Sequence, residues 1–261
     1  MKKILAIILT LTVAVLGLVA FSGCGGKKKN ENTLYVYTHS GFEPFEFLDA
    51  NGKLVGVDLD VMEEIGEILG YDIIVSDIEF NNIFTEVQNG KNAVGAAGIT
   101  QKASRDEIAL ATIPYFSSTQ YVIAPKGTFT AGAKVTVEEI IAKAGSKKVG
   151  VQTGTTGADL VKSVNDTITI SYDNAIIASG DIGSTVASVV IDKMPAKSIC
   201  ASNANFEYWE IDAEVESYVL YFNKSQADMV TKVNAILQTM IDDGVIDYLV
   251  AKHSHNILPK N

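Results

Sequence analysis

The sequence has 21 lysines and arginines together, and only one of them, Arg105, is an arginine. It lies in GITQKASRDE, where Gly98 leaves the backbone uncovered and Thr100 adds a hydroxyl. A planar guanidinium offers paired N–H donors that fit a carboxylate at two points, which an ammonium cannot do. The stretch therefore indicates a carboxylate-binding site, with a surface salt bridge to one of the two following acids as the alternative.

A second polar stretch, GVQTGTTG, follows an apolar run and opens a helical pattern. Its glycines, Thr155 and Thr156 would expose N–H groups at the positive end of a helix, which favours an anion. Gln152 adds an uncharged polar side chain. The lysine of a phosphate-binding loop is absent. An ordinary tight turn between a strand and a helix is the alternative.

Two further stretches place polar or aromatic side chains next to apolar runs. VVIDKMP ends in Asp192, whose carboxylate would bind an ammonium or cap the next helix. THSGFEPFEF contains Phe42 and His39 at a turn. Phe42 is either a wall of a ligand site or part of the core.

No catalytic motif is present. The sequence lacks CxxC, HExxH and GxSxG, and His253 and His255 form an isolated pair in the polar end of the chain. We therefore expect neither a metal nor a cofactor. The formal net charge of −10 argues against a nucleic-acid partner, since such proteins usually carry basic patches.

The first residues have the order of an export signal: Lys2 and Lys3, an apolar run over 4–20, and small residues before Cys24. FSGC resembles a bacterial lipoprotein box, so we expect a signal peptide over 1–23 and a lipid on Cys24. An uncleaved membrane anchor is the alternative. Residues 24–33 read as a flexible tether. Cys200 is then left without a cysteine partner, so we expect no internal disulfide.

Short apolar runs alternate with helical patterns along the rest of the chain, which predicts an α/β fold with mostly parallel sheets. The expected strands cover 34–38, 72–78, 93–99, 120–125, 147–152, 167–172, 186–192 and 218–222. One helix is expected to start near residue 58 and a short one to end near residue 88. Others are expected over 135–145, from about 157, over 226–241 and after 244. Two α/β blocks suggest two lobes, and ligands of open α/β sheets bind at the carboxyl ends of strands.

Together these stretches resemble the amino-acid-binding proteins of bacterial ABC importers, solute-binding protein family 3. The matching phrases include GFEPFEFLDANGKLVGVDLDVMEEIGEILG, AGITQKASR, KKVGVQTGTTG and VVIDKMPAK, in family order. The resemblance implies a two-lobed periplasmic-binding-protein-like fold. Lobe I would hold 34–116 plus 218–261, and lobe II 119–214, with hinges near 115–119 and 214–218.

The resemblance also implies roles for single residues. Arg105 would bind the α-carboxylate of an amino acid, and Asp192 its α-ammonium. The other implied contacts are the aromatic rings that sandwich the side chain and the donors of the GTT turn: Phe42, Phe80, Thr155 and Thr156. The implied partners are a free amino acid, an ABC permease and the membrane that holds the lipid, on the outer or periplasmic side.

One position departs from the family pattern. Members often carry an acid three residues before the first aromatic of the F-x-P-F turn, and this chain has His39. This difference argues against lysine, arginine or histidine as the ligand, so we expect the ligand to be a polar or neutral amino acid. The chain is not expected to be an enzyme. The two alternatives are a dehydratase-like enzyme of the same fold, with His39 as the candidate acid or base, and a sensing module of a receptor.

Overall fold

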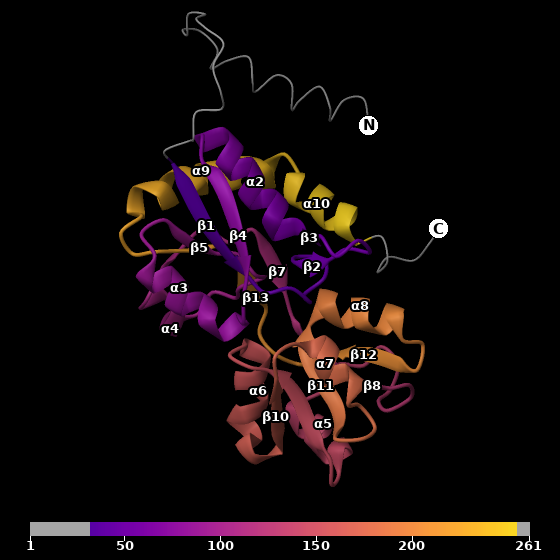
Figure 1. Ribbon diagram of the computed structural model, residues 1–261. Coiled ribbons are helices and arrows are strands. Elements are labelled where there is room, and N and C mark those ends of the chain that lie inside the picture. The colour runs from indigo at the N-terminus through magenta and orange to yellow at the C-terminus, as the bar shows by residue number, and fades with distance from the viewer. Residues whose placement is uncertain (1–31, 255–261) are drawn as a thin grey trace, which may run out of the picture. The chain divides into compact units, whose positions relative to one another are not determined.

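The computed structural model describes residues 32–254, which form one compact unit (Figure 1). The expected signal peptide, Cys24, most of the tether and His255 lie outside the described residues. Two five-stranded sheets dominate this unit, each flanked by helices. This arrangement confirms the predicted α/β fold with two lobes.

The first sheet has the strand order β4-β1-β5-β14-β6. Its three parallel strands alternate with helices in the sequence, as the apolar runs predict, while β14 runs antiparallel to both of its neighbours. The strands are β1 (Thr33–Thr38), β4 (Asp72–Asp77), β5 (Ala93–Gly95), β6 (Leu110–Ala111) and β14 (Tyr221–Phe222).

Helices from both ends of the described chain cover this sheet. Val61, Met62 and Ile65 of α2 are fully buried, as their spacing predicts, whereas Ile68 is half exposed. Gly70 ends α2 in the left-handed conformation. Helix α10 packs against α2 and α9. The helices are α2 (Val57–Leu69), α3 (Ile83–Asn89), α4 (Ala103–Asp106), α9 (Ala227–Asp242) and α10 (Val245–His253), with a 3₁₀ turn η1 (Phe80–Asn82) before α3.

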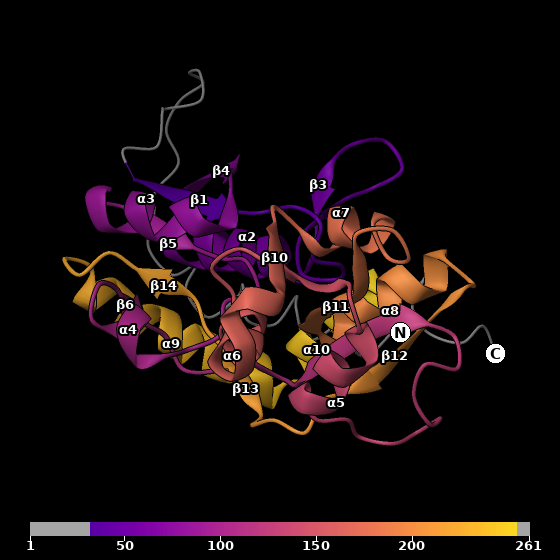
Figure 2. The same ribbon diagram turned by 90° about the horizontal axis from the view of Figure 1, so that it is seen from below.

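The second sheet has the order β10-β9-β11-β8-β12, in which β10, β9 and β11 pair in parallel and β8 runs antiparallel to both of its neighbours, β11 and β12. Helices α5 and α6 lie on one side of it and α7 and α8 on the other (Figure 2). The strands are β8 (Gln120–Pro125), β9 (Lys148–Gln152), β10 (Thr169–Tyr172), β11 (Val186–Asp192) and β12 (Phe206–Glu210). The helices are α5 (Val137–Ala144), α6 (Thr156–Asn165), α7 (Ala175–Gly180) and α8 (Lys193–Ser202), with a 3₁₀ turn η2 (Asp166–Ile168).

Two short antiparallel pairs complete the fold. Strand β7 (Phe116–Ser118) pairs with β13 (Glu216–Tyr218), where the chain passes between the two sheets. Strand β2 (Phe47–Leu48) pairs with β3 (Leu54–Val55) in a hairpin.

The structure differs from the sequence-based expectation at three places. The expected strand over 93–99 ends at Gly95, and the chain then turns at Gly98, whose φ of 51° is left-handed. The expected strand over 218–222 is split between β13 and β14. A helix was expected after Asp192, and α8 is that helix. No expectation covered the short elements α4, α7, β2, β3, β6, β7 and β12, each of which is six residues long or shorter. Among the residues described, no helix is long and apolar enough to cross a membrane.

Candidate functional site

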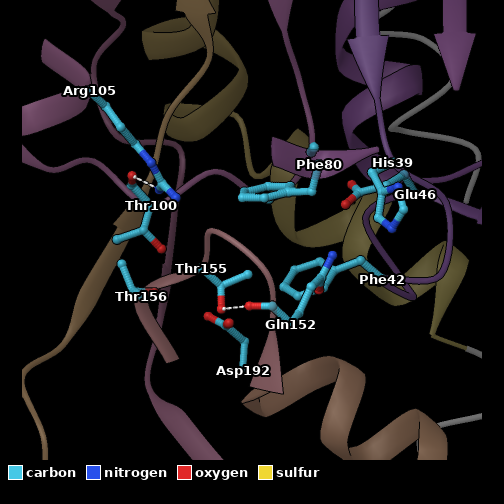
Figure 3. Close-up of a pocket in the computed structure, with 12 residues that line it drawn as sticks. His39, Phe42, Glu46, Phe80, Thr100, Arg105, Gln152, Thr155, Thr156 and Asp192 are labelled. Carbon is cyan, nitrogen blue, oxygen red and sulfur yellow. Dashed lines mark hydrogen bonds between the residues drawn. The ribbon is translucent and has the colours of Figure 1, made fainter. Parts of the chain in front are cut away.

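The structure brings all ten expected ligand-binding residues to one pocket between the two sheets (Figure 3). The space in the pocket that a water molecule can occupy is only about 20 Å³, so the walls must move apart before an amino acid can enter. The residues that line it are His39, Phe42, Phe80, Gly98, Thr100, Arg105, Gln152, Thr155, Thr156 and Asp192, together with Glu46 and Ala97, which were not predicted.

Arg105 projects from the short helix α4 and is only 4% exposed. Its Nη1 donates to the carbonyl oxygen of Thr100 at 2.6 Å, and its Nη2 donates to that of Gly154 at 3.0 Å. Gly154 belongs to the loop after β9, so one guanidinium links the two sheets. The alternative interpretation of Arg105, a surface salt bridge with one of the two following acids, is therefore wrong. Burial lowers the pKa of Arg105, but an arginine side chain keeps its charge in proteins.

Aromatic rings hold the guanidinium of Arg105 in place. Its Cζ lies 5.6 Å from the ring centre of Phe80 and 5.1 Å from that of Phe84. Such contacts favour a cation at a fixed position. The arrangement suits a ligand with a carboxylate.

Asp192 is the last residue of β11 and is 4% exposed. The hydroxyl of Tyr218 donates to its Oδ1 at 2.6 Å, and Nε2 of Gln120 donates to its Oδ2 at 3.1 Å. Asp192 occupies the N-cap position of α8, as the alternative expected, but its side chain makes no capping bond to the helix. Burial raises the pKa of Asp192 to about 7, and the nearby carboxylate of Glu216 adds to the rise. A cationic group at this carboxylate would relieve both effects.

Glu216 of β13 accepts hydrogen bonds from both sides of the site. The hydroxyls of Thr100 and Thr156 donate to its Oε2 at 2.6 and 2.9 Å, and Gln120 donates to its Oε1 at 3.1 Å. The hydroxyls of Thr100 and Thr156, two of the three threonine hydroxyls expected at the ligand, thus have an acceptor within the protein. This contact has no local pattern in the sequence, because Glu216 lies 116 residues from Thr100.

The GTT turn is both a tight strand–helix turn and a wall of the pocket. Thr155 caps α6 by accepting from the N–H of Ala158, and its hydroxyl donates to the carbonyl of Gln152 at 2.9 Å. Figure 3 shows this bond beside Asp192. The hydroxyl of Thr155 therefore shapes the turn rather than pointing freely into the pocket.

Phe42 lies against Gly98 and serves both expected roles, core packing and pocket wall. A Cβ at position 98 would come within 2.5 Å of the Phe42 ring. The N–H of Gly98 donates to Asp58 at 2.8 Å, so this donor is directed away from a ligand. Burial raises the pKa of Asp58 to about 6, while hydrogen bonds from Tyr115 and Gly98 lower it.

His39 follows β1 and is held between the two sheets. Its Nδ1 lies 2.8 Å from the carbonyl oxygen of Ile78 and its Nε2 lies 3.1 Å from that of Asp173. A ring protonated on both nitrogens donates to both carbonyls, whereas a neutral ring donates to one. Both ring nitrogens thus face the backbone. In the described part of the chain, no group of His, Cys, Asp and Glu has the arrangement of a metal site.

Three polar site residues missed by the sequence analysis share one cause. Gln120, Glu216 and Tyr218 reach the site through antiparallel pairing between segments that are far apart in the sequence. Gln120 lies directly opposite Asp192 in the β8–β11 register, and Tyr218 bridges to Thr100. Only the pairing of strands reveals such neighbours.

A family model describing bacterial extracellular solute-binding proteins, family 3, matches residues 34–256. The chain belongs to this family. The resemblance to the amino-acid-binding proteins of bacterial ABC importers is thus confirmed.

Individual relatives agree with this membership. A probable histidine-binding protein of Neisseria gonorrhoeae is 28% identical, with the match covering 90% of this chain and 91% of the relative. An ancestral arginine-binding protein bound to glutamine is 31% identical with a TM-score of 0.75, covering 85% of this chain and 97% of that one. A mutant of ArgBP from T. maritima has a TM-score of 0.77 at 26% identity, and the match covers 86% of this chain and 96% of that one.

Proposed function

We propose that this chain captures one free amino acid between its two sheets and delivers it to the permease of an ABC importer. The observation that carries the proposal is the placement of Arg105 and Asp192 in one pocket, one from each sheet. A free amino acid carries a carboxylate for the guanidinium of Arg105 and an ammonium for the carboxylate of Asp192. Family membership supports the same conclusion.

The two charged groups act on the two ends of the zwitterion. The ligand carboxylate binds the guanidinium of Arg105 at two points, in place of the carbonyl oxygens of Thr100 and Gly154, and the ligand ammonium binds Asp192. Hydrogen bonds to charged groups contribute about 1.5–3 kcal/mol each. Three or four of them, less the cost of ordering the ligand, give a binding free energy of about −8 kcal/mol, which corresponds to micromolar affinity.

Binding would close the two lobes, which we place at 34–116 plus 218–261 and at 119–214. The hinges lie near 115–119 and 214–218, and the pairing of β7 with β13 in these two segments supports them. Only a ligand that contacts both sheets shifts the open and closed populations. The closed form would then dock on the permease.

The ligand side chain is proposed to be polar. Phe42 and Phe80 provide apolar walls, while His39, Glu46 and Gln152 provide polar groups. The preference for a neutral side chain depends on His39 and on the uncharged Gln152. The relatives carry names for both charged and neutral ligands, with histidine, arginine and glutamine among them.

We also propose that the protein is exported and held at the membrane by a lipid on Cys24. Replacing Cys24 by alanine should release the protein from the membrane fraction of cells that express the full chain. Unchanged retention in that fraction would contradict the lipid anchor and leave the apolar run over 4–20 as the anchor.

The enzyme alternative requires a general acid or base that faces the ligand. His39 was the candidate, but both of its ring nitrogens face backbone carbonyls. The receptor module would bind the same ligand and differ only in its partner. Neither alternative has an observation in its favour here.

Thermal-shift screening of the purified protein against the twenty amino acids tests the proposal. A rise in melting temperature with one or a few amino acids is expected. If no amino acid raises the melting temperature, amino-acid binding is contradicted. If the protein chemically converts an amino acid that stabilises it, the enzyme alternative is supported.

A further inference from the structure

The carboxylate of Glu216 connects the two lobes. Glu216 lies on β13, one of the two segments where the chain passes between the sheets. Its Oε2 accepts from the hydroxyl of Thr100, in the turn after β5, and from that of Thr156, the first residue of α6. One oxygen thus holds a hydroxyl from each lobe. An ionised carboxylate accepts such bonds more strongly than a neutral group does.

This contact does not compete with the ligand, whereas another lobe contact at the site does. Nη2 of Arg105 donates to the carbonyl oxygen of Gly154, across the two sheets. In the proposed complex the ligand carboxylate takes the place of that oxygen. The bonds of Glu216 are made to protein groups alone, so they remain available to hold the lobes together around the ligand.

The amide of Gln120 joins Glu216 to Asp192. Its Nε2 donates to Oδ2 of Asp192 and to Oε1 of Glu216, both at 3.1 Å. An amide nitrogen carries two N–H donors, so one amide serves both carboxylates. Gly157 leaves room for this amide, since a Cβ there would come within 2.6 Å of the amide oxygen. The carboxylate expected to bind the ammonium and the carboxylate that joins the lobes thus share one donor.

The two carboxylates repel each other. Burial and, after it, the negative charge of Glu216 raise the pKa of Asp192 to about 7. A ligand ammonium at Asp192 would offset the repulsion, so that both groups carry their charge at the same time. A ligand that has only a carboxylate would leave the repulsion in place.

We propose that Glu216 is a positioning residue that couples recognition of the ligand ammonium at Asp192 to the contact between the lobes, with Gln120 as the link. This inference rests on the proposed function, because it assumes an amino acid held by Arg105 and Asp192. An amino acid therefore closes the lobes more completely than the same molecule without its ammonium.

Calorimetry in a double-mutant cycle tests the coupling. The probe is whichever of the twenty amino acids raises the melting temperature of the purified protein most. Glu216→Gln should weaken its binding at least tenfold. In an Asp192→Asn background, which lacks the ionic contact with the ammonium, the same change should weaken binding less than threefold. If Glu216 served only the fold, the change would weaken binding by the same factor in both backgrounds.

Small-angle X-ray scattering measures the lobe contact separately from the affinity. Saturated with the amino acid, Glu216→Gln should have a larger radius of gyration than the saturated wild type. The wild type saturated with the analogue that has hydrogen in place of the ammonium should also have the larger radius. Glu214→Gln makes the same chemical change at an exposed residue of the same segment, and it should match the wild type in affinity and in radius.

An equal factor for Glu216→Gln in both backgrounds would overturn the inference, as would equal radii of saturated Glu216→Gln and wild type. A wild type that binds no amino acid would instead refute the proposed function.

Should Glu216→Gln fail to fold, Thr156→Val provides the second variant, because it removes the hydroxyl that one lobe contributes. It should weaken binding of the amino acid at least threefold and enlarge the radius of gyration of the saturated protein. Wild-type affinity and radius in folded Thr156→Val would count against the inference.

Discussion

Replacing Arg105 by lysine tests the geometry of the site most specifically. The guanidinium donates through two different nitrogens, Nη1 to Thr100 and Nη2 to Gly154, at 2.6 and 3.0 Å. In the liganded site we expect this fork to meet the carboxylate at two points. A lysine at this position retains the charge but has a single nitrogen, so it cannot occupy both directions.

The size of the effect follows from one lost hydrogen bond. A bond to a charged group contributes about 1.5–3 kcal/mol, and about 1.4 kcal/mol corresponds to a factor of ten in affinity. Arg105→Lys should therefore weaken binding by at least about tenfold and by up to about 150-fold. The cost is not reduced by solvent, because Arg105 is almost fully buried.

Isothermal titration calorimetry at pH 8 with the best ligand from the amino-acid screen measures this effect. Lys143→Arg, the reverse exchange on the exposed surface of α5, is the matched control and should bind like the wild type. An affinity of Arg105→Lys within threefold of the wild type would refute the two-point contact. A melting curve of the free variant establishes that it folds.

Three further predictions concern the pH dependence of binding, the substitution Asp192→Asn and the substitution Gly98→Ala. Because the pKa of Asp192 is raised to about 7 by burial and by Glu216, and an ammonium favours its ionised form, binding should release a proton. Affinity should be full above pH 7 and fall about tenfold per pH unit below it, and a flat calorimetric profile from pH 5.5 to 8 would contradict this. Asp192→Asn should bind an amino acid and its deaminated analogue about equally in a competition assay, and surviving discrimination would count against the ammonium contact. Gly98→Ala combines a left-handed backbone with a Cβ 2.5 Å from the Phe42 ring, so it should destabilise the fold by about 1–3 kcal/mol, and an unchanged melting temperature would rule out that crowding.

Much of the fold was predictable because its parallel strands and helices alternate along the chain. The buried face of α2 shows the expected spacing, and Asp192 lies at the end of its strand as predicted. Each expected site residue follows or ends an apolar run. Since the carboxyl ends of parallel strands meet at one edge of a sheet, these residues could be grouped before their contacts were known.

The remaining site residues depend on contacts that have no local pattern. Glu216 and Tyr218 enter the site through β13, and Gln120 lies opposite Asp192 only because β8 is antiparallel to β11. Glu46 stands between two phenylalanines, and nothing in this local pattern indicates that its side chain lines the pocket. Its burial follows from the turn that joins it to Phe42, which the sequence alone does not reveal.

The central claim is that Arg105 and Asp192 hold the two ends of one amino acid. Calorimetry of the wild type with the best amino acid, its analogue without the ammonium and its analogue without the carboxylate tests this claim most directly. The account predicts that each analogue binds at least about tenfold more weakly, since each leaves one buried charge unpaired. Equal affinity for either analogue would contradict it.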